Sequence, residues 1–216
     1  TEKTVTVHAL DSGKVYTETY DKLLLAPGAK PTVPALSGVS SERVFTLRTV
    51  EDTLRIRHFV EDQKPKNAVL AGGGFIGLEM AENLTEMGVS VTIVQRSNQL
   101  LAPLDADMAS FVHAEMRRHG VTLRLWETVT GFRQDGDSVL TLLESSEPLH
   151  SDMVLLAIGV TPDTHLAKDV GLELGIRGSI AVTERMETSV PDIYAVGDAV
   201  EVTHFVTGQK ALISLA

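Results

Sequence analysis

Residues 68–79 read AVLAGGGFIGLE, an apolar stretch that runs into glycines spaced as G-x-G-x-x-G and then into a helix-like pattern. Gly72 permits a tight turn, Gly74 lets a ligand approach the backbone, and Gly77 lets the helix pack on the strand. N–H groups at such a helix start lack intrahelical acceptors and can bind phosphate oxygens. A second apolar stretch at 89–94 completes a strand–helix–strand unit.

This pattern predicts a pocket for the pyrophosphate of a dinucleotide. The alternative is a tight turn of an α/β protein that binds no ligand. The expected pocket residues are Gly72, Gly73, Gly74, Phe75, Ile76 and Gly77.

Composition and charge exclude several classes of function. The formal net charge of −10 argues against a nucleic-acid partner, because phosphate binding requires clustered Lys and Arg. No apolar run approaches the roughly 20 residues needed to cross a bilayer, and the start lacks a signal-peptide pattern, so we expect a cytoplasmic protein without a membrane partner. With no cysteine, the chain can form neither disulfides nor thiolate metal sites. His113 and His119 lack the i, i+4 spacing of a metal pair, and we expect no metal.

Local patterns predict the remaining elements. Alternation at 4–9 and 14–19 around a turn signal predicts a hairpin, and the apolar run at 23–26 predicts a strand covered on both faces. Other expected elements are helices at 51–60 and 105–119, strands at 121–126, 153–158 and 193–196, and a hairpin around Asp135-Gly136. The apolar side chains of the second helix are expected to form one stripe facing the core, made of Met108, Phe111, Val112 and Met116.

Four segments in order, 26–31, 72–79, 157–162 and 188–199, resemble the flavin-dependent pyridine nucleotide-disulfide oxidoreductases. The stretch 103–108 is most similar to the branch that contains coenzyme A disulfide reductases, persulfide reductases and NADH oxidases.

The resemblance implies an α/β fold in which a Rossmann-like NAD(P)-binding domain is inserted into a split FAD-binding domain. The inserted domain is expected to have three layers, with a parallel sheet and a β-meander. Residues 46–159 would bind NAD(P)H, and residues 1–45 and 160–216 would be pieces of the FAD domain. The first glycine fingerprint, the redox cysteine and the C-terminal dimerisation domain of the family are not in this sequence, so we interpret the chain as a fragment of a longer enzyme.

By resemblance, Asp198 would anchor the ribityl chain of FAD, with Gly197 beside it; a turn or helix cap is the alternative. The segment Ala26, Pro27 and Gly28 would serve FAD through its backbone geometry. Glu79, expected in the first helical turn, would lie near the nicotinamide, and its alternative is a charge–dipole interaction. Ile158 and Gly159 would let the dinucleotide pass close to the backbone, or would only end a strand.

The choice between NADH and NADPH depends on the end of the strand at 89–94, where NAD-binding proteins usually have an acidic residue. This chain has Gln95 and Arg96 there. Arg96 could pair with a 2′-phosphate through charge-assisted hydrogen bonds, which favours NADPH. Alternatively, Arg96 points to solvent and Gln95 binds the ribose hydroxyl of NADH.

The function implied by the resemblance is hydride transfer from NAD(P)H to FAD and electron delivery to a disulfide, persulfide, peroxide or O₂. The fragment would mainly bind nucleotide and contains no expected catalytic residue, and the parent would be a homodimer acting on a small-molecule or thiol/disulfide substrate. Two alternatives stay open: a reductase for ferredoxin or rubredoxin, and a nucleotide-binding module without catalysis.

Overall fold

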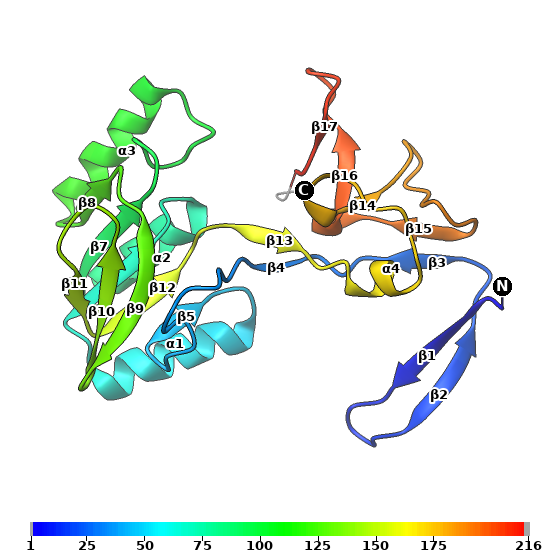
Figure 1. The fold of residues 1–216 in the computed structure, drawn as a ribbon, viewed down its shortest axis with the longest axis horizontal. Coiled ribbons are helices and arrows are strands. Elements are labelled where there is room, and N and C mark those ends of the chain that lie inside the picture. The colour runs from blue at the N-terminus through cyan, green and yellow to red at the C-terminus, as the bar shows by residue number, and fades with distance from the viewer. Residues whose placement is uncertain (1, 214–216) are drawn as a thin grey trace. The chain divides into compact units, whose positions relative to one another are not determined.

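The computed structural model describes residues 2–213 of the chain. It contains two compact units, one formed by Pro31–Val160 and the other by Thr1–Lys30 together with Thr161–Ala216. Their elements are labelled in Figure 1. Each unit is described separately below.

A five-stranded parallel sheet forms the centre of the Pro31–Val160 unit, with strand order β5-β12-β6-β7-β8. The strands are β5 (Val44–Thr46), β6 (Asn67–Ala71), β7 (Ser90–Gln95), β8 (Thr122–Leu125) and β12 (Met153–Leu156). All four residues of β12 and four of the five in β6 are buried, as expected for strands covered on both faces. The order reverses at β6, whose neighbours are β7 and the distant β12. This α/β arrangement confirms the predicted fold class.

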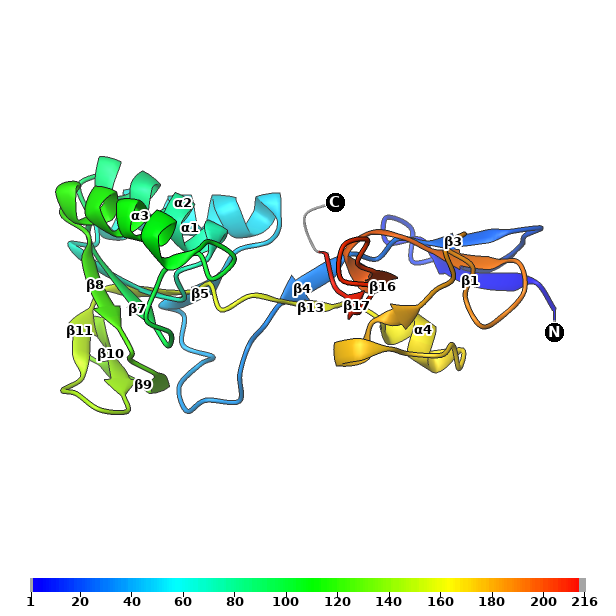
Figure 2. The same cartoon turned by 90° about the horizontal axis from the view of Figure 1, so that it is seen from above.

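Three helices cover one face of this sheet (Figure 2). They are α1 (Val50–Gln63), α2 (Phe75–Glu86) and α3 (Ala106–Arg118), and they share one apolar core with the strands. The expectation that Met108 and Phe111 belong to this core is wrong, because their exposed fractions are 53% and 71%. Only Ala109 of α3 is buried, while Val112 and Met116 are partly buried against the core.

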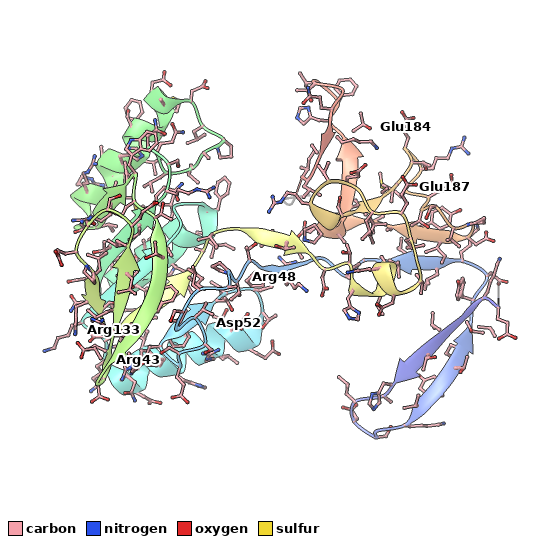
Figure 3. All side chains as sticks on the ribbon, in the orientation of Figure 1. Arg43, Arg48, Asp52, Arg133, Glu184 and Glu187 are labelled. Carbon is pink, nitrogen blue, oxygen red and sulfur yellow. The ribbon has the colours of Figure 1, made fainter. Side chains whose placement is uncertain are left out.

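The first of these helices begins at a capping box. The Thr49 hydroxyl accepts a hydrogen bond from the Asp52 N–H at 3.2 Å, and the Asp52 carboxylate accepts one from the Thr49 N–H at 3.0 Å. Asp52 is labelled in Figure 3. The cap ends the extended chain after β5 and starts α1 at Val50, one residue before the predicted start.

A three-stranded antiparallel meander lies on the opposite face of the sheet (Figure 2). Its strands are β9 (Val129–Asp135), β10 (Ser138–Leu143) and β11 (Leu149–Ser151). Phe132 and Val139 of the meander pack with Val69 and Val154 of the parallel sheet in a second core. The unit therefore has the three layers that the sequence predicted: helices, parallel sheet and meander.

The other unit is built from small sheets. The predicted hairpin is present as β1 (Thr4–His8) and β2 (Val15–Thr19), and β3 (Leu23–Leu25) pairs in parallel with β15 (Ile193–Ala195). Leu24 is 60% exposed, so the expectation that this strand is covered on both faces is wrong; within residues 2–213 its sheet has two strands, β3 and β15. A third core lies around Ile180 and Ala195.

Several short elements complete the description. They are β4 (Ala29–Pro31), which pairs with β13 (Val160–Pro162), helix α4 (His165–Asp169), the single-turn helices η1 (Ile176–Gly178) and η2 (Gly197–Ala199), and the strands β14 (Ile180–Ala181), β16 (Val200–Thr203) and β17 (Lys210–Ala211). The sequence patterns did not predict β16 and β17.

Candidate nucleotide-binding site

The candidate site lies where the strands of the parallel sheet end. The Gly72 N–H donates to the Val94 carbonyl at 2.8 Å, and the Ala157 N–H donates to the Ala71 carbonyl at 2.7 Å. These bonds join the segments that follow β6, β7 and β12. In open α/β sheets, ligands bind at this edge, where the strand order reverses.

Close contacts within the fold account for two of the three fingerprint glycines. Gly72 has φ +111°, and a Cβ atom there would collide with the Ala157 carbonyl oxygen. A Cβ atom on Gly77 would collide with the Gly72 carbonyl oxygen, so this glycine lets α2 approach the turn. Between them, a Cβ atom on Gly73 would meet the side chain of Leu100.

Gly74 differs from its neighbours because nothing in the protein requires a glycine there. Its φ of −84° and ψ of −172° are open to any residue, and a Cβ atom would have no neighbour within 4 Å. The space in front of Gly74 is therefore free, and it adjoins the start of α2.

The start of α2 supplies donors to that space. Gly74 is the N-cap residue and offers no side-chain cap, so the N–H groups of the first turn depend on another acceptor. Phe75 is 50% exposed and Ile76 is half-buried. A 12-residue helix also has a positive N-terminal end, which favours an anion.

Glu79 is not in the first turn of this helix, contrary to expectation. The helix begins at Phe75, its first turn contains no acidic residue, and the exposed Glu79 lies one turn further on. The charge–dipole alternative weakens accordingly, since that effect fades beyond the first turn.

Gln95, the last residue of β7, holds the glycine loop in place. Its side-chain oxygen accepts from the Gly73 N–H at 3.0 Å, and its side-chain nitrogen donates to the Ser97 hydroxyl at 2.7 Å and to the Gln99 carbonyl at 3.3 Å. The side chain is therefore already bonded within the chain. Arg96 beside it is exposed and forms no ion pair among residues 2–213.

Ile158 and Gly159 follow β12 at the same edge of the sheet. Ile158 is 44% exposed. Gly159 has φ +108° with no atom within 4 Å of a built Cβ, and its carbonyl accepts from the Thr32 N–H at 2.9 Å. The backbone there is open on one side and anchored on the other.

The second set of expected site residues lies in the other unit. The strands β3 and β15 are parallel and in register, so their C-terminal ends lie at the same edge of the sheet. Pro27 and Gly28 follow one strand there, and Gly197 and Asp198 follow the other. The Val196 N–H donates to the Leu25 carbonyl at 3.0 Å and holds the two exits together. The set, which also includes Ala26, is thus one local cluster: Ala26 is exposed, while Gly28 and Asp198 are half-buried.

Four residues near the glycine loop and the end of β7 were not predicted from the sequence: Leu100, Leu101, His113 and Trp126. The Leu101 N–H donates to the Gly73 carbonyl at 2.8 Å, and the Leu100 N–H donates to the His113 Nε2 atom at 3.0 Å. Burial, and secondarily the nearby Arg117, lower the pKa of His113, which keeps the ring neutral and able to accept. No local pattern indicates a bond from α3 to this loop.

The fourth of these residues is Trp126, which directly follows β8. Its N–H donates to the Ser97 carbonyl at 3.1 Å, its φ is +57°, and it is 73% exposed. The signal available in the sequence was that it is the single tryptophan of the chain.

Residues 2–213 contain neither a cluster of metal ligands nor a membrane-spanning helix. No group of three or more His, Asp and Glu side chains in 2–213 could hold a metal ion. None of the helices in that range has the length and apolarity needed to span a membrane.

A family model described as pyridine nucleotide-disulphide oxidoreductase matches residues 1–212. The chain belongs to this family. It is 36% identical over 214 residues to the NAD(P)H sulfur oxidoreductase (CoA-dependent) of Pyrococcus abyssi, covering 98% of this chain and 47% of the relative.

Solved structures of the family agree with this assignment. The reduced CoADR-RHD of Bacillus anthracis is 46% identical with a TM-score of 0.93, covering 99% of this chain and 38% of that one. An engineered water-forming NADPH oxidase bound to NADPH is 33% identical with a TM-score of 0.89, covering 99% of this chain and 47% of that one. The chain therefore spans about half the length, or less, of the family members it matches.

Proposed function

We propose that this chain is the pyridine nucleotide-binding part of a flavoprotein oxidoreductase. The observation that carries the proposal is Gly74, a glycine that neither the backbone angles nor the packing requires. It stands at the start of α2, where free N–H groups and the helix dipole favour a pyrophosphate. Residues 46–159 would bind the nucleotide through Gly72, Gly73, Gly74, Phe75, Ile76 and Gly77, with Ile158 and Gly159 flanking it toward the nicotinamide.

The nucleotide is proposed to be NADPH in preference to NADH. Both ends of the Gln95 side-chain amide already form hydrogen bonds within the chain, so this side chain is not available to a ribose hydroxyl. Arg96 beside it is exposed. In the engineered NADPH oxidase, three consecutive substitutions introduce Ala-Arg-Ser, 18 positions after a substituted glycine. The same spacing separates Gly77 from the sequence Gln95-Arg96-Ser97. The guanidinium of Arg96 is a suitable partner for a 2′-phosphate, whereas the Ser97 hydroxyl already donates to the Gln99 carbonyl at 3.0 Å.

The flavin is proposed to meet this chain at the edge of the β3–β15 sheet. Asp198 would accept hydrogen bonds from the hydroxyls of the FAD ribityl chain, and Ala26, Pro27, Gly28 and Gly197 would shape the backbone beside it. When bound, the nicotinamide would supply a hydride and the flavin would accept it. Glu79 would lie on the nicotinamide side of the helix start.

The whole protein is proposed to pass these electrons to a disulfide, a persulfide, a peroxide or O₂. Relatives named for sulfur, for coenzyme A disulfide and for NADH oxidation support this range. Because the chain has no cysteine, any thiol chemistry would come from residues outside it. We further propose that the whole protein is a cytoplasmic homodimer.

The test is an isothermal titration of the 216-residue chain with NADPH and with NADH, beside an absorption scan for bound flavin. We expect NADPH to bind about tenfold or more tightly than NADH, and Arg96→Gln to remove that preference. Arg133→Gln, at an exposed arginine of β9, is the matched control (Figure 3). Binding of neither nucleotide would contradict the proposal, and a preference for NADH would contradict the role given to Arg96.

A further inference from the structure

Trp126 combines three properties that are unusual together. It is the single tryptophan of the chain, it is 73% exposed, and its φ of +57° is in the left-handed region. A bulky residue is strained in that conformation, and exposure of a large aromatic ring gains nothing for the fold. Neither local geometry nor packing accounts for a tryptophan at this position.

The backbone at Trp126 is hydrogen-bonded to the segment Gln95–Ser97, which contains the arginine proposed to select the cofactor. Its N–H donates to the Ser97 carbonyl at 3.1 Å, and the next N–H, that of Glu127, donates to the Gln95 carbonyl at 3.1 Å. These two bonds tie the turn after β8 to the segment at the end of β7, beyond the last pair of the ladder, Gln95 and Leu125. Trp126 at the end of β8 therefore lies next to Ser97 and close to Arg96, which follow the end of β7.

A buried carboxylate holds the same turn from the other side. Glu127 is only 7% exposed, and its carboxylate accepts from the Ser146 hydroxyl at 2.6 Å and from the Ser145 N–H at 3.1 Å. The hydrogen bonds from Ser146 and then Ser145 lower the pKa of Glu127, so the anchor stays charged near neutral pH. Trp126 is thus displayed from a turn bonded on both sides.

The position of this turn matches one end of the proposed nucleotide. If the pyrophosphate lies at the start of α2 after β6, the adenosine ribose lies at the end of β7. The nucleotide would run along the ends of the strands in the order β6, β7, β8. Its adenine base would then lie at the end of β8, directly before Trp126.

We propose that the Trp126 indole stacks on the adenine base of the bound nucleotide and forms the outer wall of the adenosine end of the pocket. This inference rests on the proposed function. An exposed indole offers a flat apolar face to a base, and such stacking contributes to binding without selecting between NADH and NADPH.

The test uses ADP-ribose, which contains the adenosine and the pyrophosphate but no nicotinamide and no 2′-phosphate. The single tryptophan makes fluorescence a direct readout in the unaltered chain, and we expect ADP-ribose to quench it. Trp126→Gly should weaken ADP-ribose binding roughly tenfold. It should also raise the unfolding midpoint or leave it unchanged, because glycine is suited to positive φ.

The matched control is Phe111→Ala, which removes another exposed aromatic ring from the same unit and should not change the affinity. If ADP-ribose binds with no change in fluorescence, or binds Trp126→Gly as tightly as the unaltered chain, the stacking inference is wrong. The quench measured on the unaltered chain decides the matter even if Trp126→Gly does not fold. A chain that binds neither NADPH nor ADP-ribose contradicts the proposed function instead, so the two failures are distinguishable.

Discussion

The side-chain oxygen of Gln95 accepts a hydrogen bond from the backbone N–H of Gly73 at 3.0 Å. This bond ties the end of β7 to the middle of the glycine loop after β6. The residue proposed to stand beside the cofactor-selecting arginine is therefore also bonded to the proposed pyrophosphate loop. A substitution that keeps an acceptor for the Gly73 N–H tests the proposed role in cofactor choice with this bond retained.

Gln95→Glu keeps an acceptor for the Gly73 N–H, removes the donor to the Ser97 hydroxyl and the Gln99 carbonyl, and introduces a negative charge beside the proposed 2′-phosphate. We expect NADPH affinity to fall by about tenfold or more through repulsion. NADH affinity should be kept or improved, because a carboxylate accepts from ribose hydroxyls. Titration of both nucleotides measures this, with Gln63→Glu at the exposed end of α1 as the control for charge. Equal losses for NADH and NADPH would contradict the assignment of this position to cofactor choice.

Gly74→Ala should leave the fold intact and impair nucleotide binding. The new methyl group has no protein neighbour within 4 Å and φ is negative, so stability should be unchanged or higher by about 0.4–1 kcal/mol. The same methyl group would occupy the space proposed for the pyrophosphate, and we expect affinity for NADPH to drop by at least about tenfold. Urea unfolding and calorimetric titration measure the two effects.

Gly77→Ala provides the contrast to this variant. Its Cβ atom would collide with the Gly72 carbonyl oxygen, so it should destabilise the chain by about 1–3 kcal/mol. If Gly74→Ala instead behaves like Gly77→Ala, Gly74 is required by the fold and does not report a ligand.

Protonation of His113 should lower the free energy of unfolding of the chain as the pH falls. The pKa of this ring is lowered below its ordinary value of 6.5, so the unfolded state binds a proton more readily than the folded state. This contribution is complete above pH 6.5 and is lost as pH falls below that value toward the folded-state pKa. Protonation would also remove the acceptor for the Leu100 N–H.

The measurement is the urea midpoint between pH 7.5 and pH 5 for the unaltered chain and for His113→Gln, which retains an acceptor but does not titrate. The decline should be shallower in the variant. Parallel pH profiles would show that His113 does not contribute.

The purified chain should bind NADPH without reducing disulfides. It contains no cysteine to exchange with a substrate disulfide, and the flavoprotein relatives are about twice its length. We expect no thiol release from an aromatic disulfide in the presence of NADPH above the rate without protein. Turnover by a preparation free of other reductases would contradict the role proposed for this chain.

Local rules explain why the glycine motif and the order of the elements could be predicted. The turn at Gly72 and the close approach at Gly77 are requirements of the backbone, and they leave a pattern within a few residues. The failed prediction for Met108 and Phe111 has a different origin. The helix α3 contacts β8, which is an edge strand, so the sheet is too narrow to cover the whole apolar stripe.

The missed residues depend on contacts between distant segments. His113 meets Leu100 across a loop, and Trp126 meets Ser97 between the segments that follow β7 and β8, so neither contact has a local signature. Gln95 was found from its position in the motif. However, the partners of its amide group depend on a rotamer and on a loop path that spacing alone does not specify.

The hairpin β1–β2 has a different thermodynamic character from the parallel sheet. Its residues are all exposed or half-buried, and an isolated two-stranded ladder is marginally stable in water. In contrast, the central strands β6 and β12 are almost completely buried. Hydrogen exchange in the hairpin should therefore proceed through frequent local opening, while amides of β6 and β12 exchange only when the whole Pro31–Val160 unit unfolds. One chain thus contains segments that sample solvent on very different timescales.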